Sequence, residues 1–379
     1  MVATNFRLIR DIEVLRAVAV LGVILQHMNG NLFPKLAASQ GLPSVFYGGW
    51  AGVDLFFCIS GFVIARSFLP RAMNPSHEEP YRYLAFRFWV SRLFRLAPSA
   101  WFWLLVILAL CVGYNRSGVF GTLETNLWWT ISGIFNFSNY LFVQYFGVAK
   151  PGVSFVYWSL SLEEQFYLLF PIVVWLFKRR LVWFLVAVVL VQLFQERGLY
   201  QMMFRTDAIA LGVLLAMTHS ATAGVLTRLR GICNGWLACG LVLCLIAALF
   251  YIGSFRQVEM PLQVGLVALV SAVLVWLCSG AEVVVCRGGF FGQSLLWIGK
   301  RSYAMYLIHI PVLFFIRESA FRADVSLAEH PLIASMLALL MIFLLAAANY
   351  RWLEAPLRAR GKSIAAGIGN KQRHPQRSN

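Results

Sequence analysis

Apolar runs of 18 or more residues recur along nearly the whole length of this 379-residue chain. Such a run is typical of a helix that crosses a lipid bilayer. The runs are continuous, whereas strands of a membrane β-barrel would appear as alternating segments of about ten residues. No stretch is long or polar enough to form a separate soluble domain. The sequence therefore predicts an all-α fold, a polytopic transmembrane helical bundle.

Composition supports this fold class. The chain is 60% hydrophobic and 13% charged, whereas soluble domains are about 45–50% apolar and about 25% charged. These values exclude a soluble enzyme, a disordered chain and a secreted disulfide scaffold. The seven cysteines show no metal-ligand spacing. The first apolar run ends without a small-residue cleavage site, so we expect it to be a membrane span and not a cleavable signal peptide.

We expect about ten crossings, near residues 12–30, 50–69, 96–114, 156–177, 181–195, 205–221, 234–252, 260–279, 303–317 and 331–350. Residues 125–147 alternate between aromatic and polar side chains, which suits an interfacial or re-entrant segment. With both termini in the cytoplasm, 24 of the 32 Lys and Arg residues fall on the cytoplasmic side, in agreement with the positive-inside rule. We expect a transmembrane domain over residues 1–359 and a disordered, basic cytoplasmic tail over residues 360–379.

The net charge of +16 does not indicate nucleic-acid binding. The basic residues lie between apolar runs and form no continuous basic domain. The expected environment is the lipid bilayer.

Ionisable side chains inside a span cost several kcal/mol unless they are paired or solvated, so each is a functional candidate. Arg16 and His27 are eleven residues apart, which places both on one helix face about 16 Å apart. A snorkelling arginine and a structural histidine would explain them equally well. Asp54, near the start of the second span, could orient an imidazole or cap its own helix, and both roles can hold together.

Two further clusters carry charge. Glu163 and Glu164 point about 100° apart on a helix, so only one of them can face a given partner; capping by Ser159 or Ser161 explains one glutamate but not both. Arg92 and Arg95, with Arg87 upstream, can grip a phosphate or anchor the chain to anionic lipids.

Smaller candidates complete the set. Arg205 and Asp207 suggest a local ion pair, and Tyr306 and His309 lie in the 303–317 span.

Six blocks resemble, in order, the acyltransferase 3 family of membrane-bound O-acyltransferases. They are the Arg16-to-His27 spacing, GVDLFFCISGF at 52–62, SRLFRLAP at 91–98, WSLSLEEQFY at 158–167, RTD at 205–207 followed by Gly212, and SY at 302–303 with YLIH at 306–309. Together they cover about residues 10–355. Two departures, Cys58 and Ala97, touch no charged position.

The resemblance implies transfer of an acyl group, most often acetyl, from cytoplasmic acyl-CoA (acetyl-CoA) to a hydroxyl of a cell-envelope glycan or another hydroxylated acceptor. Some family members carry a fused extracytoplasmic domain; we expect the stand-alone type here. The implied location is a bacterial inner membrane, and no metal is expected.

The resemblance also implies residue roles. His27 would act as general base, with Asp54 or Glu163 orienting its ring. A covalent acyl-enzyme stays open, as does the choice between Glu163 and Glu164. Arg16, Trp158 and Ser159 are the candidate oxyanion donors. Arg92, Arg95 and Arg87 would hold the CoA phosphates. The acceptor-binding candidates are Trp158, Ser159, Tyr167, Arg205, Asp207, Tyr306 and His309.

Two other function classes are weighed. A secondary transporter or flippase of an anionic or glycolipid substrate explains the spans and buried charges equally well, but the two halves show no inverted repeat of motifs. A non-catalytic membrane scaffold predicts that His27→Ala has no effect.

Overall fold

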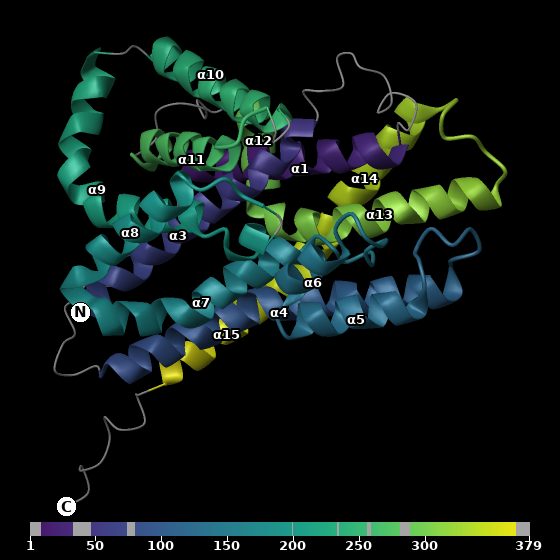
Figure 1. Cartoon of the computed structure of the whole chain (residues 1–379), viewed down its shortest axis with the longest axis horizontal. Helices are drawn as coiled ribbons and strands as arrows, with labels where there is room; N and C mark the ends of the chain where they lie inside the picture. Colours follow the sequence, from purple (N-terminus) through teal and green to yellow (C-terminus); the bar gives the residue numbers. More distant parts are fainter. Residues whose placement is uncertain are drawn as a thin grey trace, which may run out of the picture. The chain divides into compact units, whose positions relative to one another are not determined.

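The computed structural model describes residues 9–32, 47–73, 80–198, 200–232, 235–255, 259–280 and 289–368. The secondary structure within these ranges is helical, with no β-strand (Figure 1). The helical fold class is therefore confirmed. The expected tail at 360–379 is described only to Ile368, and its remainder lies outside the described residues.

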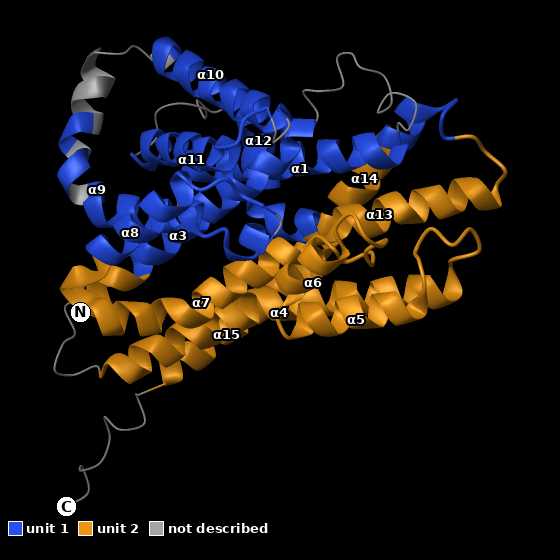
Figure 2. Cartoon of the chain, viewed as in Figure 1, with its two compact units in different colours: residues 1–67, 182–306, 327–335 blue, residues 68–181, 307–326, 336–379 orange. Residues whose placement is uncertain are grey.

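The chain divides into two compact units, each described by itself (Figure 2). Unit 1 comprises residues 1–67, 182–306 and 327–335. Its helices are α1 (Arg10–Leu32), most of α3 (Ala51–Met73), α8 (Leu181–Leu193), α9 (Asp207–Ile232), α10 (Gly235–Ser254), α11 (Gln263–Ser279), α12 (Phe290–Lys300) and the first residues of α13 (Ser302–Arg322) and α14 (Pro331–Asn349).

Unit 2 comprises residues 68–181, 307–326 and 336–379. It contains α4 (Tyr81–Gly113), α5 (Leu123–Ile134), α6 (Ser138–Tyr145), α7 (Tyr157–Phe177), the remainder of α13 and α14, and α15 (Ala355–Gly367). A π-helical turn at Tyr350–Glu354 joins α14 to α15.

Within the described ranges, five helical segments are long and apolar enough to cross a membrane: Tyr47–Met73, Tyr81–Gly113, Trp236–Ser254, Ser302–Arg322 and Pro331–Gly367. The expected number of ten crossings is not established by this criterion. Helices α8 and α11 have only 13 and 17 residues. The segment expected at 125–147 coincides with α6 and most of α5, two short helices of 8 and 12 residues.

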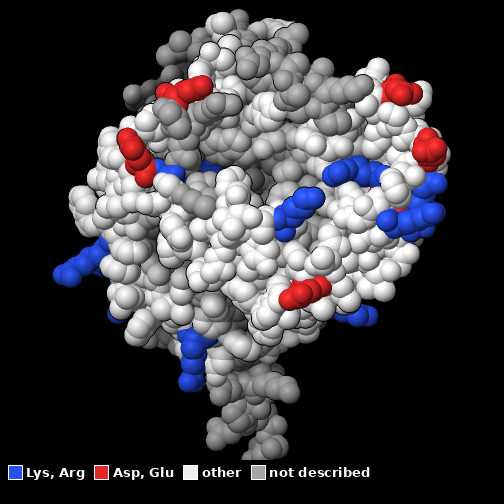
Figure 3. Space-filling view, turned by 45° about the vertical axis from the view of Figure 1, so that its right-hand side comes forward, with Lys and Arg blue, Asp and Glu red and all other residues white. Residues whose placement is uncertain are grey.

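The outer surface is strongly apolar. Many large side chains are exposed, among them Leu105 at 62%, Trp183 at 73% and Trp236 at 82%. Charged side chains are scattered between uncharged residues on the face shown in Figure 3. Soluble proteins rarely expose so much contiguous apolar surface, whereas a membrane protein presents it to lipid. We conclude that this is a membrane protein.

Three helical regions differ from the sequence-based expectation. Helix α4 begins at Tyr81, well before the expected start near 96, so the arginines Arg87, Arg92 and Arg95 lie on a continuous helix. Helix α12 packs against α1, and α15 packs against α4. Neither α12 nor α15 has a long apolar run of its own, and the expected domain boundary at 359 falls inside α15.

Glycines bring the helices of unit 1 into backbone contact. A Cβ atom at Gly61 of α3 would lie 2.2 Å from the Ile209 carbonyl oxygen of α9, and one at Gly212 of α9 would lie 2.1 Å from the Cys58 carbonyl oxygen. A Cβ at Gly299, at the end of α12, would lie 1.9 Å from the Glu13 carbonyl oxygen of α1. Small residues at such positions are typical of membrane helix interfaces.

Polar contacts fix the helices of unit 2. The Trp103 indole of α4 donates to Asn349 Oδ1 of α14 at 3.1 Å. The buried carboxylate of Glu318 on α13 accepts from the Arg116 backbone N–H at 2.7 Å and from the Ser117 backbone N–H at 3.0 Å. Arg322 adds a salt bridge to Glu318 at 2.8 Å. The carboxylate is thus satisfied, as burial of a charge requires.

Candidate functional site

In unit 1, Asp54 forms a buried, bidentate ion pair with Arg205. Arg205 Nε donates to Asp54 Oδ1 at 2.7 Å and Arg205 Nη2 donates to Oδ2. The Trp50 ring faces the same guanidinium, with its centroid 4.7 Å from Cζ. The Trp50 indole N–H in turn donates to the Gly253 carbonyl of α10 at 2.8 Å. The start of α3 and the residues before α9 are therefore joined through charge.

Asp207 has a different partner from the one expected. Its carboxylate accepts from Arg197 Nη1 at 3.2 Å and from Arg197 Nη2. Gln192 Oε1 accepts the backbone N–H groups of Thr206 and Asp207 at 3.0 and 3.1 Å. The direct Arg205–Asp207 ion pair suggested by the sequence is wrong, since Arg205 pairs with Asp54 and Asp207 with Arg197. The charges of Arg205 and Asp207 still interact electrostatically.

Arg16 and His27, the two candidates of the first expected span, both lie on α1. Arg16 forms an ion pair with Glu13 at 2.9 Å. His27 Nδ1 lies 2.9 Å from the Val23 carbonyl oxygen, and because a carbonyl only accepts, Nδ1 must carry the proton. In the neutral ring the lone pair is then on Nε2, which is the atom able to accept a proton.

In unit 2, Tyr167 links Glu163 to Arg92. The Tyr167 hydroxyl donates to Glu163 Oε1, one turn earlier on α7. The Arg92 guanidinium carbon lies 5.7 Å from the centroid of the Tyr167 ring and 5.6 Å from that of Phe88. One aromatic residue therefore contacts both an acidic and a basic candidate.

The neighbouring residues of α7 face α6. Gln165 Nε2 donates to the Asn136 carbonyl at 2.7 Å and to Asn139 Oδ1 at 3.0 Å. The side chain of Asn136 also lies near the Glu164 carboxylate. Glu163 and Glu164 thus have different partners, as the angle between them on the helix requires.

Trp158 and Ser159, at the start of α7, make local contacts. The Trp158 ring stacks on Phe142 of α6, with centroids 5.5 Å apart. The Ser159 hydroxyl donates to the Val156 carbonyl at 3.2 Å.

The three arginines of α4 have unequal surroundings. Arg87 Nε donates to the Ile368 carbonyl at 2.9 Å, where it caps the C-terminal end of α15. Arg92 contacts aromatic rings, as described above. Arg95 forms no hydrogen bond or ion pair among the residues that the structure describes.

The two candidates of α13 fall into different units. Tyr306, in unit 1, packs edge-to-face on Phe56 with a centroid distance of 6.3 Å. His309, in unit 2, is completely buried.

The candidates form two sets. Unit 1 holds Arg16, His27, Asp54, Arg205, Asp207 and Tyr306, and unit 2 holds Arg87, Arg92, Arg95, Trp158, Ser159, Glu163, Glu164, Tyr167 and His309. Sequence reasoning missed Arg197, Gln192 and Trp50. Arg197 sits between apolar segments with no pattern that points to Asp207. Across the described ranges, no three His, Cys, Asp or Glu residues gather as a metal site would require.

Comparison with known proteins gives one family. A family described as an acyltransferase domain matches residues 9–351. The chain is 25% identical to the O-acetyltransferase OatA of Staphylococcus aureus, over 97% of this chain and 60% of that protein. It is 23% identical to the peptidoglycan O-acetyltransferase OatA of Listeria monocytogenes, over 93% of this chain and 56% of that protein. The chain thus spans less than two thirds of the curated relatives it matches. No solved structure matches it.

Proposed function

Because this chain belongs to the acyltransferase domain family, which matches residues 9–351, we propose that it is an integral-membrane O-acyltransferase. The observation that carries the proposal is that this match includes every charged candidate residue in both units. The named relatives are O-acetyltransferases, and one is named for peptidoglycan. We therefore propose acetyl as the acyl group and a hydroxyl of a cell-envelope glycan as the acceptor.

The proposed donor is cytoplasmic acetyl-CoA. In this arrangement the chain crosses the bacterial inner membrane about ten times with both termini in the cytoplasm, which leaves most Lys and Arg residues inside. Arg92 and Arg95 on α4 then lie on the donor side. Arg95, which has no partner among the described residues, has its guanidinium available for a phosphate.

His27 is the proposed general base. Its Nε2 accepts the proton of the acceptor hydroxyl while the hydroxyl oxygen attacks the thioester carbonyl. The new C–O bond replaces the C–S bond, and the proton passes from His27 to the departing CoA sulfur. The tautomer set by Val23 supports this role, since it places the basic lone pair of the ring on Nε2.

Other roles follow from the contacts. Both oxygens of Asp54 are engaged by Arg205, so we assign this pair to positioning the start of α3. The Tyr167-bound carboxylate of Glu163 is the proposed acidic group of unit 2. Trp158 and Ser159 are proposed to contact the acceptor.

The decisive experiment compares His27→Ala with wild type in inverted membrane vesicles. It measures CoA release from acetyl-CoA and acetylation of added cell-wall glycan. Loss of a general base lowers such rates about 10²- to 10⁴-fold. The variant should therefore show neither CoA release nor glycan acetylation, although its abundance in the membrane equals that of wild type. The matched control is His330→Ala, at an exposed loop position, which should keep wild-type rates.

Two results would contradict the proposal. Wild-type protein that releases no CoA with any glycan acceptor is not an acetyl-CoA-dependent transferase. Substrate flux across the vesicle membrane without donor consumption would favour the transporter interpretation.

A further inference from the structure

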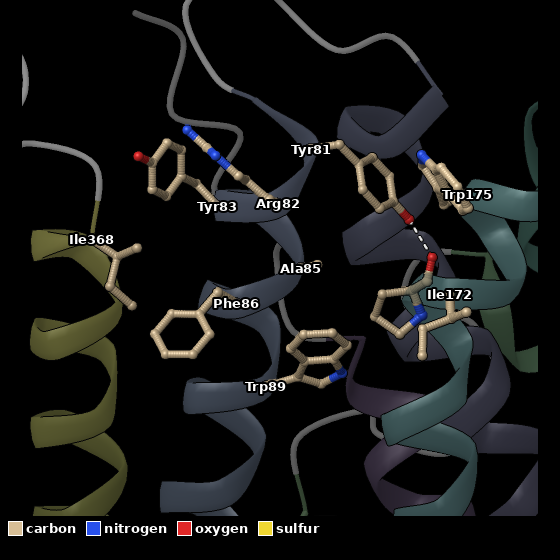
Figure 4. A pocket seen from close by; sticks show the side chains of 10 residues that line it. Tyr81, Arg82, Tyr83, Ala85, Phe86, Trp89, Ile172, Trp175 and Ile368 are labelled. Carbon is tan, nitrogen blue, oxygen red and sulfur yellow. Dashed lines mark hydrogen bonds between the residues drawn. The ribbon is translucent and has the colours of Figure 1, made fainter.

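A largely apolar cavity of about 650 Å³ lies between α4, α7 and the end of α15, within unit 2 (Figure 4). Its walls are Tyr81, Arg82, Tyr83, Ala85, Phe86, Trp89, Pro171, Ile172, Trp175 and Ile368. Apart from the exposed Arg82, every side chain in its wall is aromatic or aliphatic. No residue of the cavity belongs to the proposed acyl-transfer machinery.

The position of Pro171 explains how this cavity is held open. Proline has no N–H, so the Tyr167 carbonyl, four residues earlier, lacks its usual helical donor. The Trp89 indole N–H of α4 donates to that oxygen at 3.2 Å. The Tyr81 hydroxyl donates to the Pro171 carbonyl at 2.5 Å (Figure 4). Two aromatic side chains therefore tie α4 to α7 and form fixed walls.

A second cavity, of about 790 Å³, adjoins the first and shares Tyr81 and Trp175 with it. It is lined by the basic run Lys178–Arg180, which directly follows α7. All three basic side chains are exposed, and none forms an ion pair within the described chain. Neither cavity has a described acidic residue in its wall. This second cavity is therefore suited to an anion.

The apolar cavity also opens to the surface of the molecule. Phe86, Ile172 and Trp175 in its wall are 53%, 46% and 54% exposed. Tyrosine and tryptophan are enriched at the membrane–water boundary, and basic pockets beside membrane helices attract anionic headgroups. The two cavities together match one amphipathic molecule with an apolar chain and a negative head.

We propose that these adjoining cavities bind one anionic phospholipid, with an acyl chain against Phe86, Trp89 and Ile172 and its phosphate beside Lys178–Arg180. On the topology proposed above, this lipid belongs to the cytoplasmic leaflet. The site takes neither the acyl donor nor the glycan acceptor, so it does not depend on the enzymatic proposal.

Native mass spectrometry of the purified full-length chain tests the site. The protein in neutral detergent is titrated with phosphatidylglycerol or with phosphatidylcholine of the same chain length. We expect one phosphatidylglycerol to bind in preference to phosphatidylcholine. Lys178→Gly/Arg179→Gln should weaken phosphatidylglycerol binding about tenfold or more, since two charges near the phosphate are lost. Lys178 has φ +48°, a region that glycine adopts readily, so its replacement preserves the turn.

Controls separate charge from location and from cavity shape. Arg360→Gln/Lys362→Gln removes the same charge from exposed positions of α15 outside both cavities, and it should bind lipid as wild type does. Ala85→Phe fills the apolar cavity and should weaken binding with the basic run intact. If that buried substitution prevents folding, Ile172→Trp narrows the same cavity from an exposed position.

Several outcomes would overturn the proposal. Equal binding of both lipids removes the role of the headgroup charge. If the α15 control variant loses as much phosphatidylglycerol binding as the Lys178→Gly/Arg179→Gln variant, the effect is one of overall charge and not of this site. Displacement of the lipid by acetyl-CoA would assign the cavities to the donor, and displacement by glycerol phosphate alone would assign them to a free phosphate.

Discussion

Both carboxylate oxygens of Asp54 accept hydrogen bonds from the guanidinium of Arg205, which lies 151 residues further along the chain. The two side chains are 0% and 1% exposed. Trp50 covers the guanidinium and hydrogen-bonds α10 through Gly253. Three regions of unit 1 that are remote in sequence therefore depend on one buried charge pair.

Asp54→Asn should destabilise the protein strongly. Removing one member of a buried ion pair costs about 3–5 kcal/mol, because the other charge is left without compensation. We expect a large fall in the midpoint of thermal unfolding. The measurement monitors the loss of helical circular-dichroism signal of the detergent-solubilised protein. Asp324→Asn is the control, because Asp324 is exposed in a loop. Equal midpoints for Asp54→Asn and wild type would show that the pair contributes little to stability.

The contact between α3 and α9 should be sensitive to a single methyl group. A Cβ at Gly212 would lie 2.1 Å from the Cys58 carbonyl oxygen, whereas a Cβ at Gly224 of the same helix meets nothing within 4 Å. Gly212→Ala should cost about 1–3 kcal/mol through overpacking. Gly224→Ala should be neutral or stabilise by up to about 1 kcal/mol, because alanine favours a helix. The comparison uses the same unfolding assay, and similar midpoints for both variants would contradict the close backbone contact.

The helical fold could be predicted from the sequence because long apolar runs mark helices directly. Helices α12 and α15 could not be predicted in this way. Helix α12 has only 11 residues, while α15 is rich in basic residues and buries only Gly361 and Ala365. Their packing depends on contacts with α1 and α4 that no local pattern encodes.

In the candidate site, too, contacts between residues far apart in the sequence could not be predicted. The motifs selected candidate residues for the chemistry, yet the proximity of Arg205 and Asp207 in sequence suggested the wrong ion pair. Arg205 pairs with Asp54 and Asp207 with Arg197. Pairing is decided by which side chains the folded helices bring together, and a two-residue spacing does not fix this. The link from Glu163 through Tyr167 to Arg92 likewise needed the packing of α4 on α7 to become visible.

Replacement of the two adjacent glutamates should have unequal effects on acyl transfer. Glu163 accepts the Tyr167 hydroxyl, whose ring contacts Arg92, whereas Glu164 interacts with Asn136. Glu163→Gln should lower the initial rate of acetyl transfer about a hundredfold, and Glu164→Gln should lower it less. Rates are normalised to the abundance of each variant in the membrane. If Glu164→Gln is the more damaging change, the role proposed for Glu163 belongs to Glu164.

The arginines of α4 should separate donor binding from structural capping. Arg95 has no partner among the described residues, whereas Arg87 Nε donates to the Ile368 carbonyl at the end of α15. Arg95→Gln should raise KM for acetyl-CoA about tenfold or more, since a charge-assisted hydrogen bond contributes about 1.5–3 kcal/mol, and should leave the unfolding midpoint unchanged. Arg87→Gln should lower that midpoint, because α15 loses a cap on its last carbonyls, and should change KM little.

Steady-state kinetics over a range of acetyl-CoA concentrations and thermal unfolding, run on the same preparations, give both readouts. A matched change at the interface of α15 and α4 tests the structural half of this argument. A Cβ at Gly361 would lie 2.3 Å from Phe94 Cβ, so Gly361→Leu should reproduce the lower midpoint of Arg87→Gln. A higher KM for Arg87→Gln with an unchanged midpoint would instead place Arg87 among the groups that bind the donor.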